Sequence, residues 1–199
     1  MKRWAAVAAA ALFGVVVALF VVPRLAAEPH EFTGTVLSFP EEAPQFTLTA
    51  DTGEPMGIDA FRGKVVLLYF GYTFCPDICP ASLAELADAI EVLGDDGDMV
   101  QVVMVSVDPA RDTPEVLGTY VDHFDPSFVG MTGTDAEIAD VAARYNIFYE
   151  AQEGSAATGY LVDHWSGVMV IDPDGKLVEL LSFGTSGELI AADVGEWLS

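Results

Sequence analysis

Residues 64–80 read KVVLLYFGYTFCPDICP, an apolar run followed by a turn that holds both cysteines of the chain. A nearly continuous apolar run of this length is typical of a strand that is buried on both faces of a sheet. A helical pattern comes next, with apolar side chains on one face up to Gly94: Leu83, Leu86, Ala87, Ile90 and Leu93. The stretch therefore predicts a buried strand, a cysteine turn and a helix in direct succession.

Strands and helices alternate around this unit. The pattern predicts strands at 45–50, 99–107, 166–172 and 176–183, and helices after Thr113, from Thr134 to about Tyr145 and from 187 to 198. Asp172-Pro173-Asp174-Gly175 is typical of a tight hairpin between the last two strands. The alternation of strands and helices, with a hairpin before the last helix, predicts an α/β protein, a three-layer α/β/α domain of the thioredoxin-like kind.

The N-terminus carries an apolar segment of its own. Lys2 and Arg3 precede Trp4–Val22, which has no polar side chain except the indole. This length suits one membrane span, and the basic pair keeps the start of the chain inside the cell. We expect residues 1–27 to be an uncleaved transmembrane anchor, with a cleaved signal segment as the alternative. Residues 28–45, with three prolines, are expected to be a tether, and residues 46–199 a domain on the extracytoplasmic side of the cell membrane.

Composition excludes several classes of protein. The 199 residues include 31 acidic and 8 basic side chains, for a net charge of −23, which argues against nucleic acid or anionic lipid as a partner. With 52% hydrophobic residues the chain is too apolar to be disordered. Two cysteines are too few for a four-cysteine zinc site. The acidic residues are spread along the chain, and both a docking surface for a basic partner and a merely solvated acidic surface remain open.

The cysteine turn is the part of the chain with reactive chemistry. Proline lacks the N–H that a helix interior needs, so we expect the helix to begin at Pro80 with Cys79 near its N-cap. Both sulfurs would then converge above the helix N-terminus, where the dipole favours thiolates. Asp77 would oppose thiolate formation if it pointed inward, and we expect it to face solvent or the backbone. A structural disulfide is a weaker interpretation, because closing so short a loop contributes only about 2 kcal/mol.

A third ligand for a metal would have to come from a histidine. His30 lies in the expected tether, and His123 follows a predicted helix and is expected at the surface. His164 lies just before the strand at 166–172, in a loop that packs against the dithiol turn in a thioredoxin-like order. Asp163 could orient the imidazole ring as a hydrogen-bond acceptor.

Three motifs resemble the Sco/SenC family, the copper-binding assembly factors of cytochrome c oxidase. They are GYTFCPDICP (71–80), VSVDPARDTP (105–114) and YLVDHWSGVMVIDPDGKL (160–177). The resemblance runs from about Phe46 to Trp197 and includes the N-terminal anchor. The chain departs from the family at Phe74, where a histidine or another polar residue is common, and this argues against a fourth ligand from that side.

The resemblance implies a function for the cysteine turn. It implies that Cys75, Cys79 and His164 bind one copper ion, that Cys75 and Cys79 can form a redox-active disulfide, and that copper passes to the copper-A centre of cytochrome c oxidase subunit II. Two thiolates and an imidazole suit copper, with an open position for ligand exchange, although zinc accepts the same atoms. A disulfide offers no thiolate, so a thiol reductant is an expected partner. Such a chaperone would not be an enzyme.

Other functions of a dithiol remain possible. A thiol–disulfide oxidoreductase that keeps the oxidase cysteines reduced is the main alternative. Such enzymes usually carry Cys-x-x-Cys and a cis-proline, whereas this chain has three residues between its cysteines and no proline from 127 to 172. A thiol peroxidase is disfavoured because Tyr72 stands three residues before Cys75 and Leu68 where that motif has proline. A copper store or sensor cannot be separated from a delivery protein by sequence.

Overall fold

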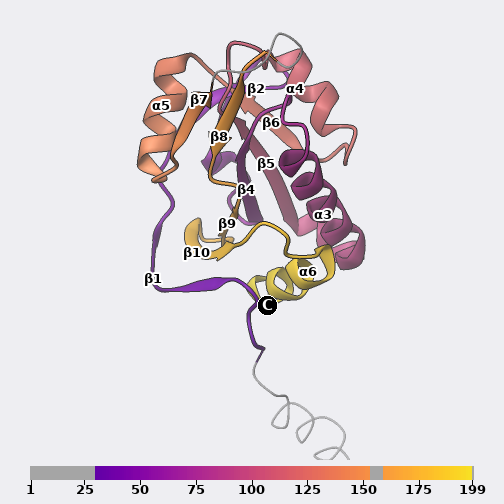
Figure 1. Ribbon diagram of the computed structural model, residues 1–199. Coiled ribbons are helices and arrows are strands. Elements are labelled where there is room, and N and C mark those ends of the chain that lie inside the picture. Colours follow the sequence, from indigo (N-terminus) through magenta and orange to yellow (C-terminus); the bar gives the residue numbers. More distant parts are fainter. Residues whose placement is uncertain (1–29, 153–158, 199) are drawn as a thin grey trace, which may run out of the picture. The chain divides into compact units, whose positions relative to one another are not determined.

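The computed structural model describes residues 30–152 and 159–198, and the chain divides into two units, Met1–Glu31 and Phe32–Ser199. The second unit is a mixed α/β fold with an eight-stranded sheet in the order β1-β10-β9-β4-β5-β6-β2-β3 and a separate sheet of β7 and β8 (Figure 1). The predicted anchor or signal segment, residues 1–27, lies outside the described residues. No helix in the described part of the chain is long and apolar enough to cross a bilayer.

The elements follow one another in an order close to the predicted one. The strands are β1 (Thr35–Glu42), β2 (Thr47–Ala50), β3 (Pro55–Gly57), β4 (Val65–Gly71), β5 (Val100–Ser106), β6 (Val129–Thr132), β7 (Tyr149–Gln152), β8 (Leu161–His164), β9 (Val168–Ile171) and β10 (Lys176–Leu181). The helices are α3 (Ile78–Leu93), α4 (Pro114–Val121), α5 (Asp135–Arg144) and α6 (Gly187–Trp197), with 3₁₀ turns η2 (Ile58–Phe61) and η3 (Gly94–Met99).

The middle of the sheet is the strand predicted from the opening stretch. β4 pairs parallel with β5 and antiparallel with β9, and every residue of β4 and β5 is buried. Helices α3 and α6 lie side by side on one side of the sheet, and α5 lies on the other (Figure 1). Leu83, Leu86 and Ile138 from these helices are fully buried. Because β4 is covered on both faces, its end is held in place by packing, and so is the start of the loop that follows it.

The helix ends are set by local signals that the sequence contains. The Thr134 hydroxyl accepts a hydrogen bond from the backbone of Glu137, whose carboxylate bonds back to the backbone of Thr134, a complete capping box at the start of α5. Thr113 caps α4, with Pro114 at its first position. Gly94 ends α3 with a positive φ of 58°, which glycine adopts without strain.

The first strand differs from the prediction of a tether over residues 28–45. Thr35–Glu42 form β1, which pairs antiparallel with β10 at the edge of the sheet. The pairing shifts register between Val36 and Glu41, and Pro40 lies in this irregular stretch. An edge strand tolerates proline at such a place because no ladder bond is lost there. Part of the expected tether is therefore a strand of the domain.

A buried pair of carboxyl groups holds the chain just before β1. Glu179 of β10 and Asp193 of α6 are both fully buried. Asp193 accepts hydrogen bonds from the backbone N–H groups of Thr33, at 3.0 Å, and Gly34, at 3.2 Å. Trp197 Nε1 donates to Glu179 Oε2 at 2.8 Å. A Cβ at Gly34 would lie 2.2 Å from Glu179 Oε1, so only glycine allows this close approach.

Candidate metal centre

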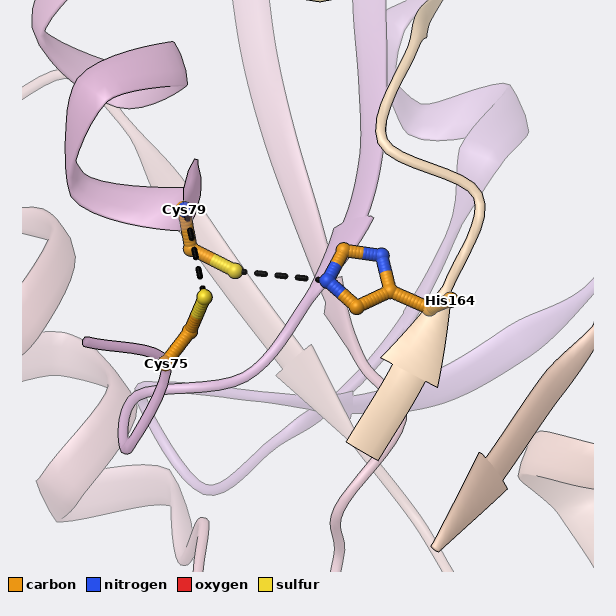
Figure 2. A group of neighbouring side chains, drawn as sticks. All are labelled: Cys75, Cys79 and His164. Carbon is orange, nitrogen blue, oxygen red and sulfur yellow. Dashed lines mark hydrogen bonds between the residues drawn. The ribbon is translucent and has the colours of Figure 1, made fainter. Parts of the chain in front are cut away.

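The two cysteines lie where β4 passes into α3. Cys75 is in the turn after the strand, and Cys79 is the second residue of α3. The backbone N–H of Cys79 donates to Cys75 Sγ at 3.4 Å, which folds the turn over the helix start (Figure 2). Cys79 is fully buried and Cys75 is half-buried, and both are free thiols. The sulfur atoms therefore face one another with one of them open to solvent.

The helix begins two residues earlier than the position of Pro80 predicts. Asp77 is the N-cap of α3, and its carbonyl accepts the first helical bond, from the backbone N–H of Ala81. Pro80 is thus the third helical residue, within the first turn. The N–H groups of that turn have no partner inside the helix, so a proline costs no hydrogen bond there. The earlier start brings Cys79 into the helix rather than leaving it at the N-cap.

His164 comes to the thiols from a distant part of the chain. It ends β8, 85 residues after Cys79, and its Nε2 lies 3.4 Å from Cys79 Sγ (Figure 2). Its Nδ1 lies 2.8 Å from the backbone carbonyl oxygen of Trp165. A carbonyl only accepts hydrogen bonds, so Nδ1 carries the proton and donates to it. The lone pair of Nε2 is then free to bind a metal ion.

The three side chains form one ligand group. The ligand atoms of Cys75, Cys79 and His164 all lie within 4.8 Å of one another. One ion bonded to both sulfurs at about 2.3 Å would hold them no more than about 4.6 Å apart. The group therefore fits a single ion with little movement. An open cleft of about 360 Å³ reaches two of the three ligands, Cys75 and His164, which line it together with residues such as Ile78 and Leu161.

The two thiols have opposite acidities. The pKa of Cys75 is well below its ordinary value of 9.0, mainly because the Cys79 thiol donates a hydrogen bond to it. Burial opposes this effect, and the backbone N–H groups of Cys79 and Asp77 add to it. The pKa of Cys79 is raised, because its proton is held by Cys75 and because it is buried. One thiolate is thus present in the metal-free site, and metal binding must displace the second proton.

Two tyrosine rings pack against the imidazole of His164. The rings of Tyr69 and Tyr72 stand edge-on to the His164 imidazole, with centroids 6.1 Å and 5.8 Å away. The Tyr72 hydroxyl also accepts a hydrogen bond from the backbone N–H of Val162 at 3.1 Å. The pKa of Tyr69 is raised, and burial is the main cause. A Cβ at Gly71 would lie 3.2 Å from Cys79 Sγ and 2.6 Å from Tyr69 Cε1, so this glycine leaves room for both.

The structure brings some of the predicted site residues together and leaves others apart. Asp77 is exposed and makes no side-chain cap bond, in agreement with the expectation that it faces solvent. Asp163 is exposed and does not orient the ring of His164, because the Trp165 carbonyl holds Nδ1 and Nε2 faces Cys79. A backbone carbonyl leaves no mark in the sequence, so this partner could not be found there. His123 is exposed, as expected.

Sequence reasoning missed the residues that hold the two parts of the site. Tyr72 contacts the backbone of β8, and Arg111 contacts the backbone just before β8. Asp112 contacts Thr73 in the cysteine turn. The signal for the last two was the motif VSVDPARDTP at 105–114. In the sequence this motif indicates only a family resemblance. Its contacts with the site become visible only in the fold.

The fold and the ligand group define a thioredoxin-like domain with a two-cysteine, one-histidine group that could hold a metal ion. A family model described as SCO1/SenC matches residues 37–199, and the chain belongs to this family. The chain is 33% identical to the protein sco1 of Schizosaccharomyces pombe over 161 residues, 79% of this chain and 61% of that protein. It is 38% identical to a SCO2-like protein of Rickettsia conorii over 135 residues, 67% of this chain and 66% of that one. The chain thus spans less than two thirds of these relatives.

Solved structures of Sco proteins have the same fold. Apo Sco1 of Thermus thermophilus, 38% identical, superposes with a TM-score of 0.77 and covers 85% of this chain and 99% of its own. ScoI of Arabidopsis thaliana, solved with copper bound, is 33% identical with a TM-score of 0.75, and covers 79% of this chain and 98% of its own. The mixed α/β fold predicted from the sequence is confirmed by these likenesses.

Proposed function

We propose that this protein is a copper metallochaperone that binds one copper ion through Cys75, Cys79 and His164. The observation that carries the proposal is the convergence of the three ligand atoms, with Cys75 and His164 lining an open cleft. Thiolates select Cu(I), and imidazole binds both oxidation states of copper. The copper-bound structure of a relative from Arabidopsis thaliana supports the choice of metal.

Delivery follows from the coordination that three ligands leave incomplete. An acceptor's sulfur or nitrogen can bond to the ion at the open position before the chaperone's ligands release it. Cys75 is half-buried and lines the cleft, so its sulfur can release the ion without disturbing the core. The acceptor we propose, from the family resemblance, is the copper-A centre of cytochrome c oxidase subunit II. The thiols must be reduced to bind, so a thiol reductant controls loading.

The proposed location follows the sequence rather than the fold. Residues 1–27 are proposed to be a single-pass anchor or a signal segment in the cell membrane. The short segment between it and β1 would tether a domain on the extracytoplasmic side. Confinement to the membrane plane would place the copper site beside a membrane-bound oxidase.

A second candidate function is thiol–disulfide exchange with the oxidase cysteines. It is favoured by the acidity of Cys75, because a thiolate attacks disulfides, and by a neighbouring thiol, Cys79, that could resolve the mixed disulfide. The described residues contain no cis peptide bond, and His164 points at the thiols. The site is therefore better suited to a metal than to a peptide substrate.

The test is a Cu(I) titration of the reduced, full-length chain under anaerobic conditions against a competing chelator. Wild type should hold one Cu(I) per chain, Cys79→Ser should bind none tightly, and His164→Ala should bind more weakly and fail to hold Cu(II). His123→Ala, a change of an exposed histidine, is the matched control. Absence of specific binding in wild type would reject the chaperone and favour the oxidoreductase. Cu(II) spectra unchanged in His164→Ala would reject the ligand assignment.

A further inference from the structure

The loop between β5 and α4, residues 107–113, contacts both parts of the ligand group. It contains Asp108, Arg111 and Asp112, of which the two aspartates are buried and the arginine is 17% exposed. The backbone N–H groups of Arg111 and Asp112 both donate to the carbonyl of Asp108, so the loop is a closed turn. Three charged side chains in a buried turn are costly unless each has partners. Their partners lie in the cysteine turn and in the histidine strand region.

Asp112 holds the cysteine turn. Its carboxylate accepts hydrogen bonds from the backbone N–H of Thr73, at 3.1 Å, and from the hydroxyl of Thr73, at 2.6 Å. The hydroxyl of Ser106, at the end of β5, also donates to it at 2.6 Å. Thr73 is two residues before Cys75. The position of the first sulfur is therefore tied to the end of β5 through one fully buried carboxylate.

Arg111 holds the segment that leads to His164. Its Nη1 donates to the backbone carbonyl of Tyr160 at 3.0 Å, and its guanidinium lies over the Tyr160 ring, 3.7 Å from the centroid. Asp108 completes the contact, because it accepts hydrogen bonds from both Arg111 Nε and the Tyr160 hydroxyl. The same guanidinium lies 4.7 Å from the Phe74 ring centroid, next to Cys75. Arg111 thus touches both parts of the site.

The histidine strand needs such an attachment. Among residues 30–152 and 159–198, β8 pairs only with β7, in a two-stranded sheet that is separate from the main one. A two-stranded hairpin is marginally stable by itself in water. Its position against the thiols therefore depends on contacts from outside the hairpin. Those contacts include the guanidinium of Arg111 and the hydroxyl of Tyr72, which accepts from the backbone N–H of Val162.

We propose that the 107–113 loop sets the distance between the thiol pair and His164, with Arg111 as the positioning residue of the histidine. The inference rests on the proposed copper function and concerns one ligand of that site. Two thiolates alone hold Cu(I), although less tightly than with the imidazole, whereas Cu(II) requires the nitrogen ligand as well. Loss of the arginine contacts should therefore weaken Cu(II) binding much more than Cu(I) binding.

The test compares Arg111→Met with wild type in the full-length, reduced chain. Methionine keeps a long apolar side chain between the aromatic rings but has no donor for Tyr160 or Asp108. We expect Cu(II) affinity to fall about tenfold or more and Cu(I) affinity to change less than about threefold. In the metal-free protein, the nuclear Overhauser contacts between the rings of His164 and Tyr72, whose centroids are 5.8 Å apart, should be lost. Circular dichroism checks that the fold is retained.

Two further variants make the experiment specific. Arg111→Lys keeps the charge but cannot bond Asp108 and the Tyr160 carbonyl together, and it should give only partial recovery. Arg144→Met is the matched control, because this arginine of α5 also donates to a backbone carbonyl and pairs with an aspartate. It should leave both copper affinities unchanged. If Arg111→Met does not fold, Tyr160→Phe carries the test, because it removes only the hydroxyl contact with Asp108.

The outcomes separate this proposal from the proposed function. Wild type without tight copper would reject the function itself. A different result would overturn only the positioning role. In that result wild type binds copper, His164→Ala loses Cu(II) binding, and Arg111→Met keeps both Cu(II) binding and the ring contacts. Equal losses of Cu(I) and Cu(II) in Arg111→Met would also overturn it, because they would indicate general damage to the site.

Discussion

Replacing Glu179 with glutamine should stabilise the domain at alkaline pH and not at acidic pH. Glu179 is fully buried in β10 beside the fully buried carboxyl group of Asp193. Burial, and then the neighbouring Asp193, raise the pKa of Glu179 from 4.5 to about 7, although the Trp197 indole donates to it. Glu179 therefore holds its proton to a higher pH in the folded protein than in the unfolded chain.

The magnitude follows from the difference between the folded and unfolded states. A carboxyl group with a raised pKa in the folded state contributes stability that is full below its unfolded pKa and is lost as the pH rises through its folded pKa. From 4.5 to about 7, at about 1.4 kcal/mol per pH unit, the loss is about 3 kcal/mol. Glutamine resembles the protonated carboxyl group and does not titrate. Glu179→Gln should therefore gain about 3 kcal/mol over wild type between pH 4.5 and pH 8.

The assay is urea unfolding of the full-length chain, followed by circular dichroism at several pH values and constant ionic strength. The quantity compared is the difference in unfolding free energy between variant and wild type, so that titration of other groups cancels. Glu188→Gln, at an exposed position of α6, corrects for the loss of one negative charge. A difference for Glu179→Gln that stays flat from pH 4.5 to pH 8 would refute the raised pKa of Glu179.

Three further predictions concern the site and the fold. Limiting iodoacetamide at pH 7 should alkylate Cys75 before Cys79 in the reduced, metal-free chain, because Cys75 is more exposed and has the lowered pKa; peptide mass spectrometry showing equal labelling would contradict this. Thr134→Ala should cost about 1 kcal/mol of unfolding free energy through loss of the α5 cap, and Thr134→Ser should recover it. Leu83→Ala, in the fully buried face of α3, should cost about 2–5 kcal/mol in the same assay, and a smaller loss would mean that the core closes around the gap.

The parts of the fold that could be predicted from sequence are those with strong local signals. β4 and β5 are buried on both faces, so their composition alone marks them as central strands. The caps at Thr113 and Thr134 and the Asp172–Gly175 hairpin depend only on residues close in sequence. These elements lie where the patterns place them. Their agreement with the fold explains why the architecture could be inferred without homologous structures.

The parts that were missed have weak or misleading patterns. β1 is mostly exposed and contains Pro40, features typical of a linker, and only its pairing with β10 makes it a strand. β7 and β8 are short, and each has at most one buried side chain, so no alternation marks them. In the site, the Cys-x-x-x-Cys spacing was visible, and His164 was indicated by its place before β9. The orientation of its ring depends on a backbone carbonyl, which every residue has.

The separation of the ligands along the chain links metal binding to the folded state. Cys75 and Cys79 are neighbours in any conformation, whereas His164 reaches them only when β8 is packed beside the cysteine turn. An ion that needs all three ligands binds the native chain alone, and it raises the free energy of unfolding by the full amount that its concentration and dissociation constant allow. An ion satisfied by two sulfurs binds the unfolded chain as well, and part of that gain is cancelled. For equal affinities to the folded domain, Cu(II) should therefore raise the free energy of unfolding more than Cu(I) does.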